Sequence, residues 1–210
     1  MPKEISYNAA EHISAKTAVD PYLRPAFSVQ NKLARLLWNI CWVLLYRTSP
    51  RPFHAWRALL LRCFGATIGP NCHFYPKSKI WAPWNLICGD QVTTGDGAEI
   101  YNPATMRLNS HVIISQEAYL CGATHDYDDP AFPLIAYAME IGAYAWICAR
   151  ASVGPGENIG EGAVLGLGSV ATRTLEPWTV YAGCPAVRVK DRVRTYPDST
   201  DSLSETEAGI

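Results

Sequence analysis

The chain has 210 residues, enough for one large domain or two small ones whose core needs no disulfide bonds. Its 49% hydrophobic and 18% charged residues exclude a chain disordered throughout, and a pI near 6.5 excludes a strongly basic nucleic-acid-binding protein. The net charge of −1 conceals an asymmetry, because residues 1–89 hold eleven Lys and Arg against three Asp and Glu, whereas residues 90–210 hold seven against sixteen. No acidic residue lies between Asp20 and Asp90. This asymmetry predicts a local contact with an anionic partner.

Residues 1–30 are polar and irregular, which predicts an arm, and residues 31–65 predict a basic helical hairpin. Ten of the eleven residues from Leu36 to Tyr46 are apolar, in a segment too short to span a bilayer, which takes ~20 residues. Thr48-Ser49-Pro50 predicts the N-cap of a second helix over 52–64. One face of that helix is expected to carry the apolar residues Trp56, Leu59, Leu60 and Phe64.

A six-residue repeat follows the hairpin. An apolar or small residue opens each hexad, and a small residue takes the fifth place in most of them. The opening residues are Ile68, Phe74 and Ile80; Cys88, Thr94 and Ile100; Leu108, Ile114 and Leu120; and Ile141, Ile147, Val153, Ile159 and Leu165. Three hexads make a triangular coil of eighteen residues, and stacked coils place the opening residues in interior columns. The alternative, ordinary turns and strands, does not explain five contiguous hexads.

The repeat loses its phase between Leu120 and Ile141, which are three hexads and three further residues apart. Residues 121–140 therefore leave the coil as a loop or interrupt its wall, and long loops on a rigid scaffold often carry function. The coil is expected over 66–192. Residues 193–210 predict a disordered acidic tail that contains Asp198, Asp201, Glu205 and Glu207.

Seven cysteines, an odd number without a CxxC pair, accompany an N-terminus that lacks the pattern of a secretory leader. Most of them lie in apolar or small-residue stretches. Free thiols in a reducing compartment, and hence a cytoplasmic protein, are the expectation. The cysteine spacing does not support a zinc site.

The hexads, the loop motif THDYDDPAF, the segment YAWICARASVGPG and the closing AGCPAVRVK resemble the left-handed parallel β-helix acyltransferases. Within them, the chain is most similar to colanic-acid-biosynthesis-type O-acetyltransferases, over about residues 27–192. The resemblance implies an all-β core with an N-terminal helical hairpin and an extruded loop. It also implies acetyl transfer from acetyl-CoA to a hydroxyl of a sugar or polysaccharide precursor, without a metal, in a homotrimer with sites between neighbouring coils.

His125 occupies the place of the loop histidine that the family uses as general base. A hydroxyl is a weak nucleophile until a base removes its proton, and imidazole titrates near neutral pH. The alternative is a solvated loop histidine. Asp126 is a candidate to orient the imidazole or to contact the acceptor, whereas Asp128 and Asp129 fit turn chemistry better.

The resemblance also implies binding positions. Tyr101 and Asn102 stand where the family lines its acceptor pocket, although Asn102 also fits a corner of the coil. The positions that match the cofactor site are Trp146, Ala149, Leu167, Gly168, Thr172, Arg173, Arg188 and Lys190. The coil itself also favours small corner residues, and Arg188 and Lys190 also fit a solvated end. Cys184 and Val187 depart from the commoner family ending, which weakens the assignment of individual phosphate contacts.

Other functions remain open. A γ-type carbonic anhydrase uses the same coil and needs three zinc ligands, for which His73, His111 and His125 are the candidates. A non-catalytic scaffold would have kept only the fold, and serine or antibiotic acetyltransferases share the core. The basic hairpin favours a surface-polysaccharide or lipid-linked acceptor. Its apolar stripe is expected to pack on the end of the coil, with weak peripheral binding to an anionic membrane as the alternative.

Overall fold

A computed structural model describes residues 26–193, so most of the predicted arm (1–30) and of the predicted tail (193–210) lies outside the described residues. The described chain forms short strands that lie on three faces of a coil. Within each face, the strands of successive turns pair in parallel. Face A contains β1 (Thr67–Ile68), β4 (Leu86–Cys88), β7 (Met106–Leu108) and β12 (Met139–Ile141). Face B contains β2 (His73–Phe74), β5 (Thr93–Thr94), β8 (Ile113–Ile114), β13 (Trp146–Ile147), β15 (Val164–Leu165) and β17 (Thr179–Gly183). Face C contains β3 (Lys79–Ile80), β6 (Glu99–Tyr101), β9 (Tyr119–Cys121), β14 (Ser152–Val153) and β16 (Val170–Ala171).

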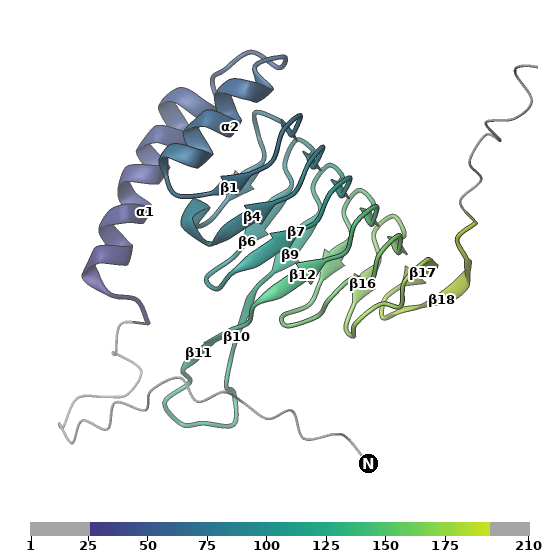
Figure 1. Ribbon diagram of the computed structural model, residues 1–210. Helices are drawn as coiled ribbons and strands as arrows, with labels where there is room; N and C mark the ends of the chain where they lie inside the picture. The colour runs from purple at the N-terminus through teal and green to yellow at the C-terminus, as the bar shows by residue number, and fades with distance from the viewer. Residues whose placement is uncertain (1–25, 194–210) are drawn as a thin grey trace, which may run out of the picture.

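In the first four turns the strands follow one another from face A to face B to face C, and in the later turns isolated bridges take the place of the face A strand. The turns stack along one axis (Figure 1). A short 3-10 helix, η3 (Pro83–Asn85), precedes β4. The last strand, β18 (Ala186–Asp191), turns back antiparallel to β17. This architecture is the predicted left-handed parallel β-helix of hexapeptide repeats.

Strand pairing places the hexad-opening residues in three interior columns. The face A column holds Ile68, Cys88, Leu108 and Ile141 and continues through isolated bridges to Ile159 and Leu175. The face B column holds Phe74, Thr94, Ile114, Ile147 and Leu165. The face C column holds Ile80, Ile100, Leu120, Val153 and Ala171. Each of these residues is at most 8% exposed, which confirms the predicted columns.

The phase break at residues 121–140 is an extruded hairpin. Strands β10 (Ala123–His125) and β11 (Leu134–Ala136) pair antiparallel, with His125 opposite Leu134. The hairpin extends away from the coil between β9 and β12 (Figure 1). The predicted extruded loop is therefore confirmed, and it forms a two-stranded arm rather than an irregular segment.

Two helical segments lie on the N-terminal end of the coil (Figure 1). The first runs as α1 (Val29–Cys41) and continues as a π-helical turn, η2 (Trp42–Tyr46); the second is α2 (His54–Cys63). We call these segments and their connection, residues 29–63, the cap. The predicted N-cap at Ser49 is wrong, because α2 begins four residues beyond Pro50 and Phe53 takes the N-cap position without a side-chain hydrogen bond.

The cap covers the open strand edges of the first turn of the coil. That turn has no turn beneath it, so its backbone carbonyls need donors from elsewhere. Trp38 Nε1 donates to the carbonyl of Ile80 at 2.7 Å, and Trp42 Nε1 donates to the carbonyl of Ser78 at 3.0 Å. Arg62 Nη2 donates to the carbonyl of Ile68 at 2.8 Å. The polar edges of the coil therefore decide which side of the cap faces inward.

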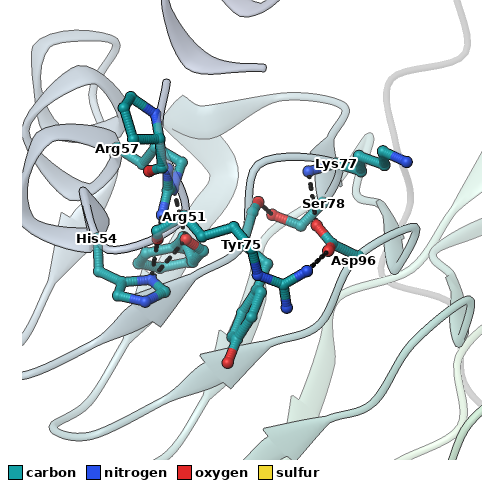
Figure 2. A network of polar contacts seen from close by, with 9 residues as sticks. Arg51, His54, Arg57, Tyr75, Lys77, Ser78 and Asp96 are labelled. Carbon is teal, nitrogen blue, oxygen red and sulfur yellow. Dashed lines mark hydrogen bonds and ion pairs between the residues drawn. The ribbon is translucent and has the colours of Figure 1, made fainter. Parts of the chain in front are cut away.

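Arg57 fixes the connection between the two segments. Its side chain is fully buried, and its guanidinium donates to Ser49 Oγ and to the carbonyls of Pro50, Arg51 and Phe74. Figure 2 shows Arg57 among these groups, with the Arg51 side chain reaching to Asp96 on the next turn of the coil. The Arg51–Asp96 ion pair measures 3.0 Å and ties the cap to the corner after β5.

The hairpin packs an apolar face on the coil, as expected, but on its first segment that face is aromatic rather than aliphatic. The aliphatic residues Leu33, Leu36, Leu37, Ile40 and Leu44 are all about half exposed, and the inward side of α1 and η2 instead carries Trp38, Trp42 and Tyr46. The predicted face of the second helix is confirmed for Leu60, which belongs to the core, and for Phe64, which packs against it. The inward residues of this helix include Arg57, Ala58, Leu60 and Leu61, whereas Trp56 and Leu59 are exposed. No helix in the described part of the chain is long and apolar enough to cross a bilayer.

Candidate functional site

His125 ends β10 and is exposed on the extruded hairpin. Its Nδ1 lies 2.9 Å from the backbone carbonyl of Phe132. A carbonyl only accepts, so Nδ1 carries the proton and the neutral ring keeps Nε2 as its acceptor. The imidazole also stacks on the Phe132 ring, with centroids 4.5 Å apart and planes 11° apart. The hairpin therefore holds the ring in one orientation and one tautomer.

The carboxylates that follow His125 stabilise the hairpin's turn. Asp126 Oδ1 accepts from the backbone N–H of Asp128 at 3.2 Å, and Asp129 Oδ1 accepts from that of Ala131 at 2.7 Å. These are the side-chain-to-backbone bonds of Asx turns. The group that orients His125 is thus a backbone carbonyl, and the carboxylate of Asp126 is used in the turn.

The predicted acceptor residues lie at the end of β6, next to the strand that leads into the hairpin. Tyr101 is partly buried, and desolvation together with the neighbouring Cys121 raises the pKa of its phenol. Its ring meets Trp81 edge to face at 5.4 Å, and the Arg35 guanidinium lies 4.4 Å from the Trp81 ring. Tyr101 and Trp81 form an aromatic wall, and Arg35 of α1 lies over its Trp81 ring.

Asn102 lies behind this wall rather than on its surface. It is 0% exposed, and its amide binds both backbone groups of Ala82. Oδ1 accepts from the Ala82 N–H at 2.9 Å, and Nδ2 donates to the Ala82 carbonyl at 2.8 Å. The side chain holds the corner between the first two turns, and its predicted contact with the acceptor remains a prediction.

Four of the predicted cofactor positions lie together on face B and at its corner with face C. Trp146 in β13 is 43% exposed and donates from Nε1 to Ser115 Oγ at 2.9 Å. Ala149 and Gly168 stack at successive corners, where the Gly168 N–H donates to the Ala149 carbonyl at 3.0 Å. Leu167 is 75% exposed beside them.

Gly168 is suited to a close approach of a ligand to the backbone. It has a φ of +63°, and a Cβ built on it would meet no atom within 4 Å. Glycine adopts this left-handed conformation without strain, and the corner is left open to solvent.

The remaining predicted cofactor positions are spread more widely. Thr172 and Arg173 are exposed at the corner that follows β16, where face C ends. Arg188 and Lys190 are exposed on β18, and Arg188 forms a 2.6 Å ion pair with Asp191. Within one chain, the strand order therefore places these cations at a different corner and on a different strand from Gly168.

The structure adds a hollow on face B that sequence reasoning missed. Its volume is about 590 Å³, and its lining includes His73, His111, Tyr144, Trp146 and Arg192. The rings of His111 and Tyr144 stack at 4.6 Å, and both residues have a positive φ. The signal was present in the repeat, because His111 and Tyr144 each stand directly before a buried fifth-place residue, Val112 and Ala145.

The histidines considered for zinc do not form one cluster. His73 and His111 border the hollow on face B, whereas His125 lies on the hairpin. Among residues 26–193, no group of three His, Cys, Asp or Glu side chains is placed to hold a metal ion.

Comparison with known proteins agrees with this architecture. No protein-family model matches the chain. WcaF of Escherichia coli (strain K12), named as a colanic acid biosynthesis acetyltransferase, is 36% identical over 165 residues, which are 79% of this chain and 91% of WcaF. A galactoside acetyltransferase solved with coenzyme A has a TM-score of 0.73 at 20% identity, over 82% of this chain and 90% of that chain. The hexapeptide-repeat acetyltransferase VCA0836 of Vibrio cholerae O1 biovar eltor, solved with acetyl coenzyme A, has a TM-score of 0.72 at 20% identity, over 81% and 93%. The chain therefore belongs to the hexapeptide-repeat acetyltransferases, in the family that includes WcaF.

Proposed function

We propose that this protein transfers an acetyl group from acetyl-CoA to a hydroxyl of a sugar or polysaccharide precursor. The observation that carries the proposal is the fixed imidazole of His125 on a hairpin extruded from a hexapeptide-repeat coil. Family membership with WcaF and the fold shared with coenzyme A-bound acetyltransferases support the donor.

The proposed chemistry is a direct attack with His125 as general base. Nε2 takes the proton of the acceptor hydroxyl while the hydroxyl oxygen attacks the thioester carbonyl. The carbon–sulfur bond then breaks, and the imidazolium returns its proton to the leaving thiolate, giving an acetyl ester and free coenzyme A. The Phe132 carbonyl accepts a hydrogen bond from Nδ1–H throughout, which keeps Nε2 directed to the reacting atoms.

Acetyl-CoA is the co-substrate in this proposal, and the open corner at Ala149, Leu167 and Gly168 is suited to its pantetheine arm. Trp146 contributes a half-exposed ring beside that corner. Thr172, Arg173, Arg188 and Lys190 are the proposed contacts for the remote, phosphate-bearing part, because cations and hydroxyls bind phosphate oxygens. Acetyl-CoA supplies the activated acetyl group when it is bound.

We further propose a homotrimer in which neighbouring coils share each site. The hairpin carries His125 away from its own coil, and none of the hairpin residues borders the hollow beside Trp146 in the described chain. Phe132, Leu134, Ile135 and Tyr137 remain only half buried on the hairpin, as expected for side chains that a second copy would cover. The cysteines are all free, which is consistent with a cytoplasmic enzyme.

Acetyl-CoA consumption measured against sugars, nucleotide sugars, serine and hydroxylated antibiotics tests the acceptor class. Turnover with serine or an antibiotic alone would overturn the sugar assignment.

Replacing His125 with alanine tests the general base. We expect kcat to fall by at least about a hundredfold with little change in the KM for acetyl-CoA, because general-base catalysis contributes about 10²–10⁴ in rate. Tyr127→Ala is the matched control, since Tyr127 is 80% exposed on the same hairpin. Unchanged turnover in the His125 variant would remove His125 from the mechanism.

A further inference from the structure

The outward side of the cap is an aliphatic surface without a partner in the described chain. We call it the outer cap face. Its members, all at least 38% exposed, are Val29, Leu33, Leu36, Leu37, Ile40, Val43, Leu44, Leu45, Phe53, Trp56 and Leu59. On α1 these positions lie opposite Trp38, because residues three, four and seven apart share a helix face. Contiguous apolar surfaces of this kind mark sites of interaction.

The two helical segments share this surface. Leu44, Leu45, Phe53 and Trp56 line one apolar groove where η2 meets the start of α2. Trp56 Nε1 donates to the Leu45 carbonyl at 3.1 Å, which holds the segments together at the groove. The buried Arg57 pins the connection from within. The outer cap face is therefore a preformed surface rather than one that must assemble on binding.

All charged residues of the cap, apart from histidine, are positive. Residues 29–63 contain six Lys and Arg and no Asp or Glu, and the whole stretch 26–89 contains eight and none. Two of these cations pair with carboxylates of the coil, Arg51 with Asp96 and Lys79 with Glu99. Lys32 on α1 and Arg47 after η2 are exposed. A second copy docking through the same face would bring like charges together, whereas an anionic surface would complement both the aliphatic residues and the cations.

We infer that the outer cap face binds the surface of an anionic lipid bilayer. The aliphatic side chains enter the boundary between headgroups and acyl chains, while Lys32 and Arg47 remain at the level of the lipid phosphates. The cap lies in the membrane plane, since it is too short and too interrupted to span it. Because the cap also closes the N-terminal end of the coil, the coil stands away from the membrane (Figure 1). The inference does not depend on the chemistry proposed for His125.

Flotation of the full chain with vesicles tests the inference directly. At low salt, wild-type protein is expected to float with vesicles of phosphatidylcholine and phosphatidylglycerol but not with phosphatidylcholine alone. Raising the salt should release it, because the electrostatic part of the attraction is screened. Failure to bind the anionic vesicles at low salt would overturn the inference.

Two pairs of substitutions separate the apolar and ionic contributions. Leu37→Glu with Leu44→Glu, and separately Lys32→Gln with Arg47→Gln, should each weaken binding by about tenfold or more. Val193→Glu is the matched control: Val193 is 84% exposed and follows β18 at the far end of the coil. Thermal unfolding establishes that each variant folds, and acetyl transfer to a soluble acceptor should persist in all three.

Sedimentation equilibrium without vesicles tests whether a second copy of the chain, rather than a lipid surface, covers the outer cap face. If wild-type protein forms assemblies larger than a trimer and the Leu37 and Leu44 substitutions reduce them to trimers, a second copy covers the face and the inference is wrong. An unchanged assembly state together with lost vesicle binding in the same variant supports the lipid surface.

Discussion

The hydroxyl of Thr94 lies in the interior column of face B, between Phe74 on one side and Ile114 on the other. Thr94 is fully buried, and its Oγ1 has no hydrogen-bond partner among residues 26–193. A buried hydroxyl without a partner costs free energy, because it has given up its bonds to water without replacing them. Thr94 is thus a weak point in an otherwise apolar column.

Thr94→Val should increase the free energy of unfolding by about 1 kcal/mol, because the side chains are similar in shape and the unsatisfied hydroxyl is removed. In a chain of this size that corresponds to a rise of about 2–4 °C in Tm. Thr93→Val is the matched control, since Thr93 is the half-buried neighbour in the same strand. A loss of stability in the Thr94 variant would mean that its hydroxyl has a partner, such as an ordered water.

At the scale of elements, the docking of α1 depends on donors that reach the carbonyls of the first turn. Trp38 is 1% exposed, and its Nε1 bond to the Ile80 carbonyl lies in the core. Trp38→Phe keeps an aromatic ring but leaves that carbonyl unpaired, so it should cost about 1–3 kcal/mol in urea unfolding.

Trp56→Phe, which removes an exposed bond to the Leu45 carbonyl, is the control and should change stability by less than about 0.5 kcal/mol. Equal losses in the free energy of unfolding of the two variants would contradict the role given to the Trp38 bond at the edge of the coil.

The contact between α2 and β2 should make stability depend on pH. Desolvation by burial lowers the pKa of His54 below its usual 6.5; the hydrogen bond to the Phe74 carbonyl opposes this, and Arg57, His73 and Arg51 add to the lowering. Between the lowered pKa and 6.5 the unfolded chain binds more protons, so stability rises with pH in that window. His54 therefore contributes its full effect above pH 6.5 and loses it as the pH falls through the folded-state pKa.

His54→Asn should flatten the fall in Tm below pH 6.5, which a thermal unfolding series between pH 5 and 8 would measure. Identical slopes for the wild type and the variant would exclude His54 as the source.

At the scale of the whole molecule, the proposed residues of the site come from different parts of the chain. His125 lies on the hairpin, whereas Trp146 and the Gly168 corner lie on the wall of the coil. A site shared between subunits can be tested by complementation. Each subunit would supply its hairpin to one neighbour and its wall to another.

Co-expression of two inactive chains should therefore restore activity. One chain carries His125→Ala, and the other carries Ala149→Trp, a substitution meant to fill the open cofactor corner. Mixed assemblies should regain part of the wild-type activity, because some sites combine an intact hairpin with an intact wall. Mixing the separately purified proteins without reassembly is the control. If mixed assemblies stay inactive, both parts of the site belong to one chain.

The sequence by itself determined the coil and the place where it is interrupted. Each hexad carries its own interior residue and its own corner, so the pattern that builds Ile147 into one turn also builds Val153 and Leu165 into the next positions. The break in that pattern at residues 121–140 located the hairpin and His125 for the same reason. Local and repeated chemistry can be recognised without knowledge of distant contacts.

Only the tertiary structure decided which side of the cap faces the coil and what holds His125. The edge of the first turn presents carbonyls that need donors, and Trp38, Trp42 and Arg62 supply them, while Leu33, Leu36 and Leu37 of α1 stay about half exposed. In the same way, His125 is oriented by the carbonyl of Phe132, seven residues away, rather than by the adjacent Asp126. Whether a backbone carbonyl needs a side-chain donor depends on whether the fold has already placed a backbone N–H beside it. The order of side chains along the chain does not contain that information.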